Sequence, residues 1–336
     1  MAQTDNTAGV VMDRNLALEL VRVTEAAALA ASRWIGRGDK NSADGAAVEA
    51  MRKAFDTVAI TGTVVIGEGE MDEAPMLFIG EKVGLYARTG GGPEVDIAVD
   101  PLEGTSITAK GGNNAIATVA LAEKGGFLHA PDIYMDKIAV GPGLPDGLVD
   151  LDASPEENLR ALARAKKCEI GDLMVCTLDR PRHADMIKAC RAAGARIMLL
   201  GDGDVSGVIA VSQPEAGVDI YMGSGGAPEG VLAAAALRCI GGQMQGRLMF
   251  ENEEQIARAK GMGVADPQRK YRVDEMARGD VMFAATGVTS GAMLRGVRRF
   301  PGGAVTHSIV MRSKTGTVRY IEGHHDFARK PSAFIA

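Results

Sequence analysis

Residues 95–105 of the chain read VDIAVDPLEGT, and this segment indicates both a type of fold and a type of chemistry. Its first part, through Val99, is apolar and reads as a buried strand that ends at Asp100 and Pro101. Pro101 stiffens the turn that follows, and Glu103 returns to the same end of the strand as Asp100. Two carboxylates at one strand end are typical of a site that binds a cation.

Helices and strands are predicted on both sides of this segment. Apolar residues at three- and four-residue steps predict a helix from Asn15 to about Trp34, and a second helix is expected from Ala46 to about Val58. Short apolar runs predict strands at residues 63–66 and 115–122, and a closing hairpin is expected at residues 304–312 and 317–322.

The second half of the chain alternates regularly. A capping box at Ser154–Glu157 opens a helix to about Lys167. Strands are then expected at residues 173–178, 196–200 and 218–222, with helices at 184–193, 205–211 and 230–240. This order predicts a mainly parallel sheet covered by helices, in which the loops after the strands build the site.

Length and composition limit the classes of protein. A chain of 336 residues suggests two domains or lobes, and the turn-rich residues 141–147 are the expected boundary. The net charge of -6, with no basic stripe, argues against a nucleic-acid binder. The four cysteines form no CxxC pair and are expected to be reduced thiols. Because we expect neither a secretory signal nor a membrane span, we expect a cytoplasmic protein.

Acidic residues gather where the predicted strands end. Glu68 and Glu70 follow one strand, Asp202 and Asp204 follow another, and Glu229 lies in a glycine-rich loop after a third. Asp44 lies near the start of the second helix. Like charges in one cleft repel, so divalent cations are their natural partners. The absence of His and Cys from these segments favours Mg²⁺ or Mn²⁺ over Zn²⁺.

Each acidic segment also has a simpler interpretation. Asp44 alone could be a helix N-cap, and Glu68 with Glu70 could be solvated turn residues. Residues 202–207 imitate the start of a calcium loop, but Gln213 stands where such a loop needs glutamate. The two Gly-x-Gly pairs do not complete a dinucleotide-binding motif. None of these interpretations explains why every acidic cluster falls at a strand end.

The segment Asp100–Thr105 resembles the D-P-[IL]-[DE]-G-[TS] signature of the lithium-sensitive, metal-dependent phosphatase superfamily. Further segments resemble, in the same order, loops of class II fructose-1,6-bisphosphatases; these are residues 36–45, 66–76, 130–135, 180–183, 201–204 and 225–230. The resemblance implies an α/β fold, the layered αβαβα sugar-phosphatase fold with two sheet-containing lobes. We expect an N-terminal metal-binding lobe at 12–150 and a C-terminal substrate-binding lobe at 151–325, with tails at 1–11 and 326–336.

The resemblance also implies roles for individual residues. The implied ligands of a divalent metal, Mn²⁺ or Mg²⁺, are Asp44, Glu68, Asp100, Glu103 and Glu229. The implied substrate-binding residues are Glu103, Gly104, Thr105, Tyr134, Arg180, Pro181, Arg182, Asp202, Gly203, Asp204 and Gly226. Thr105, Asp100 and Glu103 are the implied catalytic residues, with Thr105 orienting or helping to deprotonate the attacking water. Lys40 and His183 are left open, since each could equally have no part in the site.

The resemblance implies metal-dependent hydrolysis of the C1 phosphate of fructose 1,6-bisphosphate, as in gluconeogenesis. Alternatives with the same chemistry are a dual enzyme that also cleaves sedoheptulose 1,7-bisphosphate, or a phosphatase of inositol phosphates. A non-catalytic sugar-phosphate sensor is an alternative of another class. The expected partners are a sugar bisphosphate and further copies of the chain, as a dimer or tetramer, with neither nucleic acid nor membrane.

Overall fold

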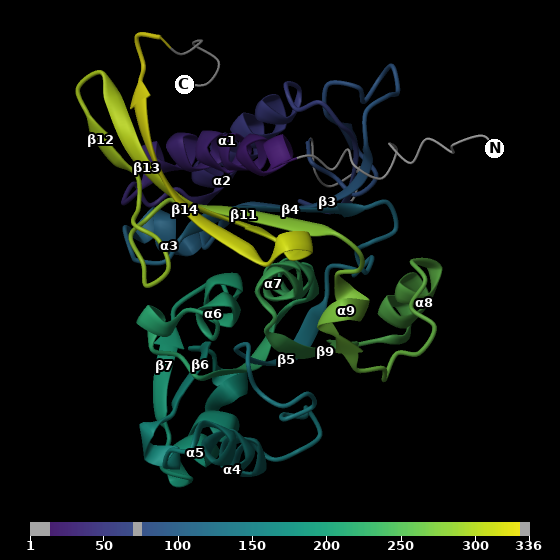
Figure 1. Ribbon diagram of the computed structural model, residues 1–336, viewed down its shortest axis with the longest axis vertical. Helices are drawn as coiled ribbons and strands as arrows, with labels where there is room; N and C mark the ends of the chain where they lie inside the picture. The colour runs from purple at the N-terminus through teal and green to yellow at the C-terminus, as the bar shows by residue number, and fades with distance from the viewer. Residues whose placement is uncertain (1–13, 70–75, 330–336) are drawn as a thin grey trace, which may run out of the picture.

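The computed structural model describes residues 14–69 and 76–329, which form alternating layers of helices and two sheets (Figure 1). Helices α1 (Arg14–Ala31) and α2 (Lys40–Phe55) cover the outer face of the first sheet. Helices α6 (Val205–Ala210) and α7 (Ala227–Ile240) lie between the sheets, and α4 (Pro155–Lys166) and α5 (Ala184–Ala192) cover the far face of the second. The expected layered αβαβα arrangement is confirmed.

Eight of the described strands form the first sheet. In spatial order they are β12 (Arg298–Phe300), β13 (Gly303–Arg312), β11 (Val281–Gly287), β4 (Ile116–Glu123), β3 (Glu94–Glu103), β1 (Thr61–Ile66) and β2 (Lys82–Val83), with β14 (Thr317–Asp326) paired to β13. Strands β13 and β14 form the expected closing hairpin. Strands β1 and β3 run parallel, and β3 pairs antiparallel with β4.

The other six strands of the described ranges form the second sheet, in the order β10 (Tyr271–Arg272), β9 (Gln243–Met249), β5 (Tyr134–Val140), β8 (Ile220–Gly226), β6 (Met174–Leu178) and β7 (Arg196–Leu200). The expectation of a mainly parallel sheet is wrong for this sheet as a whole. Strand β6 pairs parallel with β7 and β8, but β5 pairs antiparallel with both β8 and β9. The alternating segment does form the parallel part, while β5 and β9 join from outside it.

Helix α7 can lie between the sheets because nearly all of its side chains are small or apolar. Ala233, Ala234, Ala235 and Ala236 are completely buried, as expected of a helix enclosed by packed elements. Their small side chains let both sheets approach the helix closely. The helix begins directly after β8, so its first turn lies at the end of the second sheet that carries the expected site.

The two sheets exchange strands across the expected boundary near residue 150. Strand β5 precedes that boundary but lies in the second sheet, and β11 to β14 follow it but lie in the first. The division into lobes at 12–150 and 151–325 therefore does not coincide with the sheets, and it stays a prediction. The expected N-terminal tail, residues 1–11, lies outside the described residues, as do residues 330–336 of the expected C-terminal tail. The first residue of that C-terminal tail, Asp326, is instead the last residue of β14.

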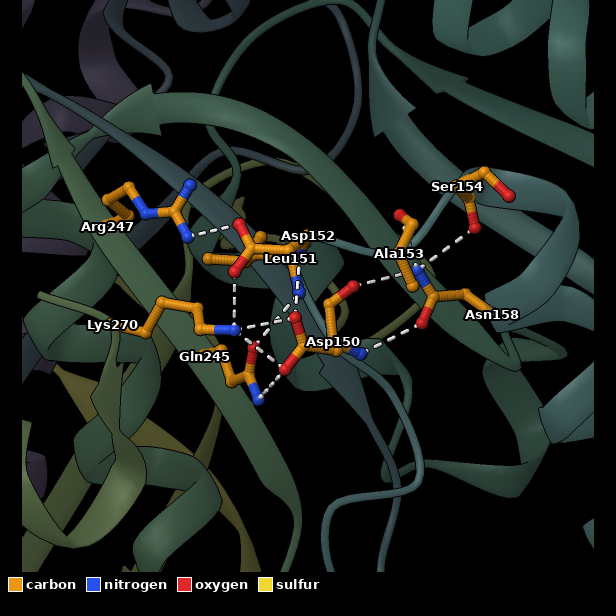
Figure 2. Close-up of polar contacts among 9 residues, drawn as sticks. All are labelled: Asp150, Leu151, Asp152, Ala153, Ser154, Asn158, Gln245, Arg247 and Lys270. Atoms are coloured by element: carbon orange, nitrogen blue, oxygen red, sulfur yellow. Dashed lines mark hydrogen bonds and ion pairs between the residues drawn. The ribbon is translucent and has the colours of Figure 1, made fainter. Parts of the chain in front are cut away.

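A polar network fixes the segment after the turn-rich residues to the second sheet (Figure 2). Lys270 Nζ lies 2.7 and 2.8 Å from the two carboxylate oxygens of Asp150 and 2.7 Å from Asp152 Oδ2. Asn158 on α4 accepts a hydrogen bond from the Asp150 N–H at 2.9 Å. The start of α4 carries the expected capping box at Ser154 and Glu157.

Two further sequence expectations can be compared with the described residues. The four cysteines are free, as expected. Within residues 14–69 and 76–329, no helix has both the length and the apolar character needed to cross a bilayer.

Candidate active site

A β-bulge in β3 directs Asp100 and Glu103 to one place. The pairing with β4 matches Asp100 to Thr118 and Glu103 to Ile116, so β3 contains one more residue than its partner across this interval. In a regular strand two residues three apart point to opposite faces, and the extra residue brings both to one side. Pro101 has no N–H group to donate to the hydrogen-bond ladder between β3 and β4. The strand was expected to end near Asp100, but it continues through the bulge to Glu103.

Gly104 and Thr105 follow the bulge in a sharp turn. Gly104 has a φ of 90°, in the left-handed region that disfavours other residues. Thr105 is then the first residue of α3 (Thr105–Lys110) and is half-buried at the wall of a cavity. The turn thus carries the hydroxyl of Thr105 into the cavity that Asp100 and Glu103 also line.

This cavity has a volume of about 350 Å³ and lies where elements from both sheets meet. Asp44 contributes from α2, Glu68 from the loop after β1, and Glu229 from the first turn of α7. The lining residues are Asp44, Glu68, Asp100, Leu102, Glu103, Gly104, Thr105, Tyr134, Leu178, Arg180, Arg182, Asp202, Gly203, Asp204, Gly225, Gly226 and Glu229. The structure therefore brings together the five residues predicted as metal ligands.

Burial and mutual repulsion raise the pKa values of these carboxyls. Burial, with Asp44 and Glu229 nearby, raises the pKa of Glu68 to about 8. Burial also raises the pKa of Asp100, next to Glu68, and the pKa of Glu103, next to Asp100. Each raised pKa means that the protein alone does not compensate the negative charge, whereas a cation would.

The donor set fits a hard divalent cation. Asp100, Glu103 and Glu229 can each offer one carboxylate oxygen, and these oxygens lie within 4.8 Å of one another. Glu103 Oε1 accepts the N–H of Val205 at 2.8 Å, which fixes its carboxylate. Oxygen ligands from several elements are typical of Mg²⁺ and Mn²⁺ sites.

Two arginines, Arg180 and Arg182, also line the cavity. Arg180 donates to Asp202 Oδ1 at 2.9 Å and to the Gly201 carbonyl at 2.6 Å. Arg182 lies over the ring of Tyr134, 4.7 Å from its centroid, and donates to Ser224 at 3.0 Å. A guanidinium fixed in this way offers a planar set of donors to an anionic group.

Asp204 is held by two residues that the sequence reasoning missed. Lys137 Nζ donates to Asp204 Oδ2 at 2.7 Å, and the Tyr221 hydroxyl donates to the same oxygen at 2.8 Å. A lysine directly before the apolar run Ile138–Val140 was the available signal, because a buried lysine needs a partner.

Glycines let the carboxylates pack directly on the main chain. A Cβ at Gly226 would lie 1.8 Å from Glu229 Oε2, and one at Gly225 would lie 2.3 Å from Asp204 Oδ2. A Cβ at Gly203 would lie 2.9 Å from Glu103 Oε1. The glycine-rich loops are therefore needed for the carboxylates to keep their positions.

Some predicted residues are placed differently from the expectation. The N-cap of α2 is Asp39, and Asp44 lies in the second turn, so the N-cap interpretation of Asp44 is wrong. The helix begins at Lys40, six residues before the predicted start at Ala46. The prediction missed its first turns because they are polar and lack apolar periodicity. Pro181 is not among the residues that line the cavity. Glu70 lies outside the described residues.

His183 and Lys40, which the sequence left open, do not line the cavity. His183 is buried, with Nδ1 2.8 Å from the Leu178 carbonyl and Nε2 accepting the Ser224 N–H at 2.9 Å. Both ring nitrogens thus bind the main chain. Lys40 is exposed at the start of α2.

Comparisons with known proteins show which family the chain resembles. A family model described as "Bacterial fructose-1,6-bisphosphatase, glpX-encoded" matches residues 14–325. The chain is 46% identical over 335 residues to a protein of Synechococcus sp. (strain JA-3-3Ab) named "D-fructose 1,6-bisphosphatase class 2/sedoheptulose 1,7-bisphosphatase", covering 94% of this chain and 96% of that one. A protein of the same name from Microcystis aeruginosa (strain NIES-843 / IAM M-2473) is 44% identical over 339 residues, covering 95% of this chain and 98% of its own.

Proposed function

The chain belongs to the family of bacterial, glpX-encoded fructose-1,6-bisphosphatases, and on that premise we propose that it hydrolyses the C1 phosphate of fructose 1,6-bisphosphate at this cavity. One observation carries the proposal: the five predicted metal ligands, from α2, the loop after β1, β3 and α7, line the same cavity as two arginines. A metal site for the reacting phosphate together with guanidinium groups for a second phosphate suits the hydrolysis of a sugar bisphosphate.

The carboxylates of Asp44, Glu68, Asp100, Glu103 and Glu229 would hold the metal, Mn²⁺ or Mg²⁺. When bound, such a cation supplies charge stabilisation for the phosphoryl group and lowers the pKa of a water molecule. The all-oxygen donor set and the raised pKa of Glu68 support this assignment.

The remaining steps are assigned to side chains of the chain itself. Thr105, at the start of α3 beside Glu103, would accept or donate a hydrogen bond that orients the attacking water. Arg180 and Arg182 would bind the distal phosphate, since guanidinium forks match phosphate oxygens. Asp202 and Asp204 would accept hydrogen bonds from sugar hydroxyls, with Tyr134, Gly104, Gly203 and Gly226 shaping the cavity.

A phosphate-release assay tests the proposal. Purified protein is given fructose 1,6-bisphosphate, sedoheptulose 1,7-bisphosphate or inositol 1-phosphate, with Mg²⁺, with Mn²⁺ or with a chelator. We expect turnover of fructose 1,6-bisphosphate that the chelator abolishes. No turnover of any substrate with either metal would overturn the proposal and favour a sugar-phosphate sensor.

Sedoheptulose 1,7-bisphosphate is the second candidate substrate. The names of two relatives, in Synechococcus and Microcystis, include this activity alongside the first. The same cavity would bind its C1 phosphate on the metal side and its distal phosphate on the arginine side. We propose the dual activity as an extension that the same assay decides.

We further propose that the protein is cytoplasmic, acts in gluconeogenesis and forms a homo-oligomer. The oligomer is supported by strand β14, which in the described part of the chain pairs with β13 alone. Tyr320 and Val318 on this edge strand are 64% and 36% exposed. A long edge with exposed apolar residues is usually covered in a native protein. Light scattering after size-exclusion chromatography would measure the mass, and a monomer would contradict this part.

A further inference from the structure

Lys137 is buried at the centre of the molecule, behind the cavity wall. Its side chain is 0% exposed, and the side chain of its partner Asp204 is 3% exposed. Lys137 Nζ donates to Asp204 Oδ2 at 2.7 Å and to the Gly226 carbonyl at 2.7 Å. A fully buried lysine is rare unless it is paired, so both contacts belong to a specific arrangement.

The space for Lys137 is built by the surrounding main chain. A Cβ at Gly225 would lie 3.1 Å from Lys137 Nζ, and a Cβ at Gly230 would lie 3.5 Å from Lys137 Cε. Lys137 lies opposite Gly223 in the pairing of β5 with β8. Glycines therefore surround the lysine where it crosses from β5 toward α6 and α7.

The two contacts connect the elements that carry the expected sugar and metal groups. Asp204 is the residue before α6, and Gly226 is the residue before α7, which carries Glu229 in its first turn. The ammonium group of Lys137 thus joins the loop after β7 to the end of β8, at the same edge of the second sheet. Movement of either segment would displace a residue that lines the cavity.

The hydrogen bonds also determine which oxygen of Asp204 faces a ligand. Lys137 and Tyr221 both donate to Oδ2, at 2.7 and 2.8 Å. Among the described residues both side-chain donors go to Oδ2, so Oδ1 is the oxygen left for a ligand in the cavity that Asp204 lines. A carboxylate held by two donors on one oxygen has lost its freedom to rotate, so its second oxygen is pre-organised to accept a hydrogen bond.

We propose that Lys137 is a positioning residue for substrate recognition, which acts by fixing Asp204 so that Oδ1 accepts a hydroxyl group of the sugar. The inference rests on the proposed function, because it assigns the sugar-binding role of Asp204 to one oxygen and one supporting lysine. Lys137 itself does not line the cavity. Its removal should therefore weaken binding of the sugar more than it slows the chemical step.

A double-mutant cycle tests this inference. Lys137→Met keeps the length of the side chain without the charge, Asp204→Asn alters the carboxylate, and the double variant carries both changes. We expect Lys137→Met alone to raise the KM for fructose 1,6-bisphosphate and the Kd for fructose 6-phosphate by about tenfold, the value of one charge-assisted hydrogen bond, with kcat changed by less than about threefold. In the Asp204→Asn background Lys137→Met should raise KM by less than about twofold, because the effects of substitutions at two interacting residues do not add.

Lys270→Met is the matched control. Lys270 also donates to two carboxylates, Asp150 and Asp152, but it lies in the network that fixes the start of α4 (Figure 2) and does not line the cavity. We expect this variant to lower the thermal midpoint without changing KM. If Lys137 had only a structural role, Lys137→Met would likewise lower the thermal midpoint and leave KM unchanged.

The inference is overturned if Lys137→Met keeps the wild-type KM and Kd, or if its effect is as large in the Asp204→Asn background as in the wild type. If Lys137→Met alone does not fold, Tyr221→Phe carries the test, because it removes one of the two donors to Asp204 Oδ2 and leaves the Lys137–Asp204 pair intact; an unchanged KM in Tyr221→Phe would then overturn the inference. Tyr221→Phe gives a second measurement, with an expected rise in KM of roughly three- to tenfold from the loss of one hydrogen bond. A wild-type protein that binds fructose 6-phosphate but releases no phosphate would instead contradict the proposed function.

Discussion

Asp100 and Glu103 lie three residues apart in one strand, yet their carboxylates offer oxygens within 4.8 Å of each other and of Glu229. The bulge between them, which contains Pro101, makes this possible. The same geometry places two like charges in a buried position, which is unfavourable without a cation. The two carboxylates therefore favour metal binding but destabilise the metal-free protein.

Asp100→Asn and Glu103→Gln should each lower kcat by about 10²–10³-fold, the usual effect of removing one electrostatic contribution to a transition state. In the metal-free protein each change should raise the thermal midpoint by roughly 2–4 °C, because a buried charge that repels its neighbours is removed. Phosphate release and calorimetry measure the two effects. Glu94→Gln is the control, since Glu94 lies on the same strand but pairs with Lys124 at the surface. Wild-type turnover in a folded Asp100→Asn protein would contradict the assignment.

The stability of the metal-free protein should fall as pH rises. Burial, with Asp44 and Glu229 nearby, raises the pKa of Glu68 from 4.5 to about 8. A carboxyl whose pKa is raised in the folded state contributes stability that is fully present below its unfolded value and is lost as pH rises through its folded value. The expected window is therefore pH 4.5 to about 8. Thermal unfolding across this range should show the decline, and Glu68→Gln should flatten it.

Binding of Mn²⁺ near neutral pH should release protons, because Glu68 must lose its proton to coordinate the metal. Titration calorimetry in two buffers of different ionisation enthalpy counts these protons. The wild type should release more of them at pH 7 than Glu68→Gln does. Equal proton release from both proteins would show that Glu68 does not control metal binding.

Gly226→Ala should impair activity without unfolding the protein. The added Cβ would lie 1.8 Å from Glu229 Oε2, so the carboxylate must move away from Asp100 and Glu103. We expect the concentration of Mn²⁺ needed for half-maximal activity to rise by about 10- to 100-fold, as for other changes that misplace a metal ligand. Gly261→Ala is the control, because a Cβ there has no neighbour within 4 Å. Unchanged metal activation in Gly226→Ala would argue against Glu229 as a ligand.

Arg182→Met should raise the KM for fructose 1,6-bisphosphate by about 10- to 100-fold, and Arg182→Lys should restore little, because lysine cannot reproduce a planar fork stacked on Tyr134. The ratio of kcat/KM for fructose 1,6-bisphosphate to kcat/KM for fructose 1-phosphate should fall in the same variants, since the distal phosphate loses its partner. Steady-state kinetics with both substrates measure this. Arg160→Met, at an exposed i,i+4 pair on α4, is the control. A preserved preference would place the distal phosphate elsewhere.

Local sequence patterns predicted the elements that carry their own signals. The capping box at Ser154 opens α4 as expected, and the alternating apolar runs became β6, α5, β7, α6, β8 and α7. Strands β5, β9 and β11 were missed. Asp136 and Lys137 interrupt the apolar residues of β5, and β9 contains two glutamines and an arginine, so neither has a strong strand pattern of its own. Both strands exist because neighbouring strands pair with them.

The sequence by itself determined the chemistry of the site: oxygen ligands, a hydroxyl beside them, and arginines for an anion. These groups lie in short segments whose residue types and spacing indicate that chemistry before the fold is known. Only the tertiary structure decided which way each group points. The bulge aims Asp100 and Glu103 to one side, His183 binds the main chain, and Lys137 fixes Asp204 from another strand. These arrangements depend on pairing between segments far apart in the chain, and the hydrogen bonds and burial that fix them exist only between segments that folding brings together.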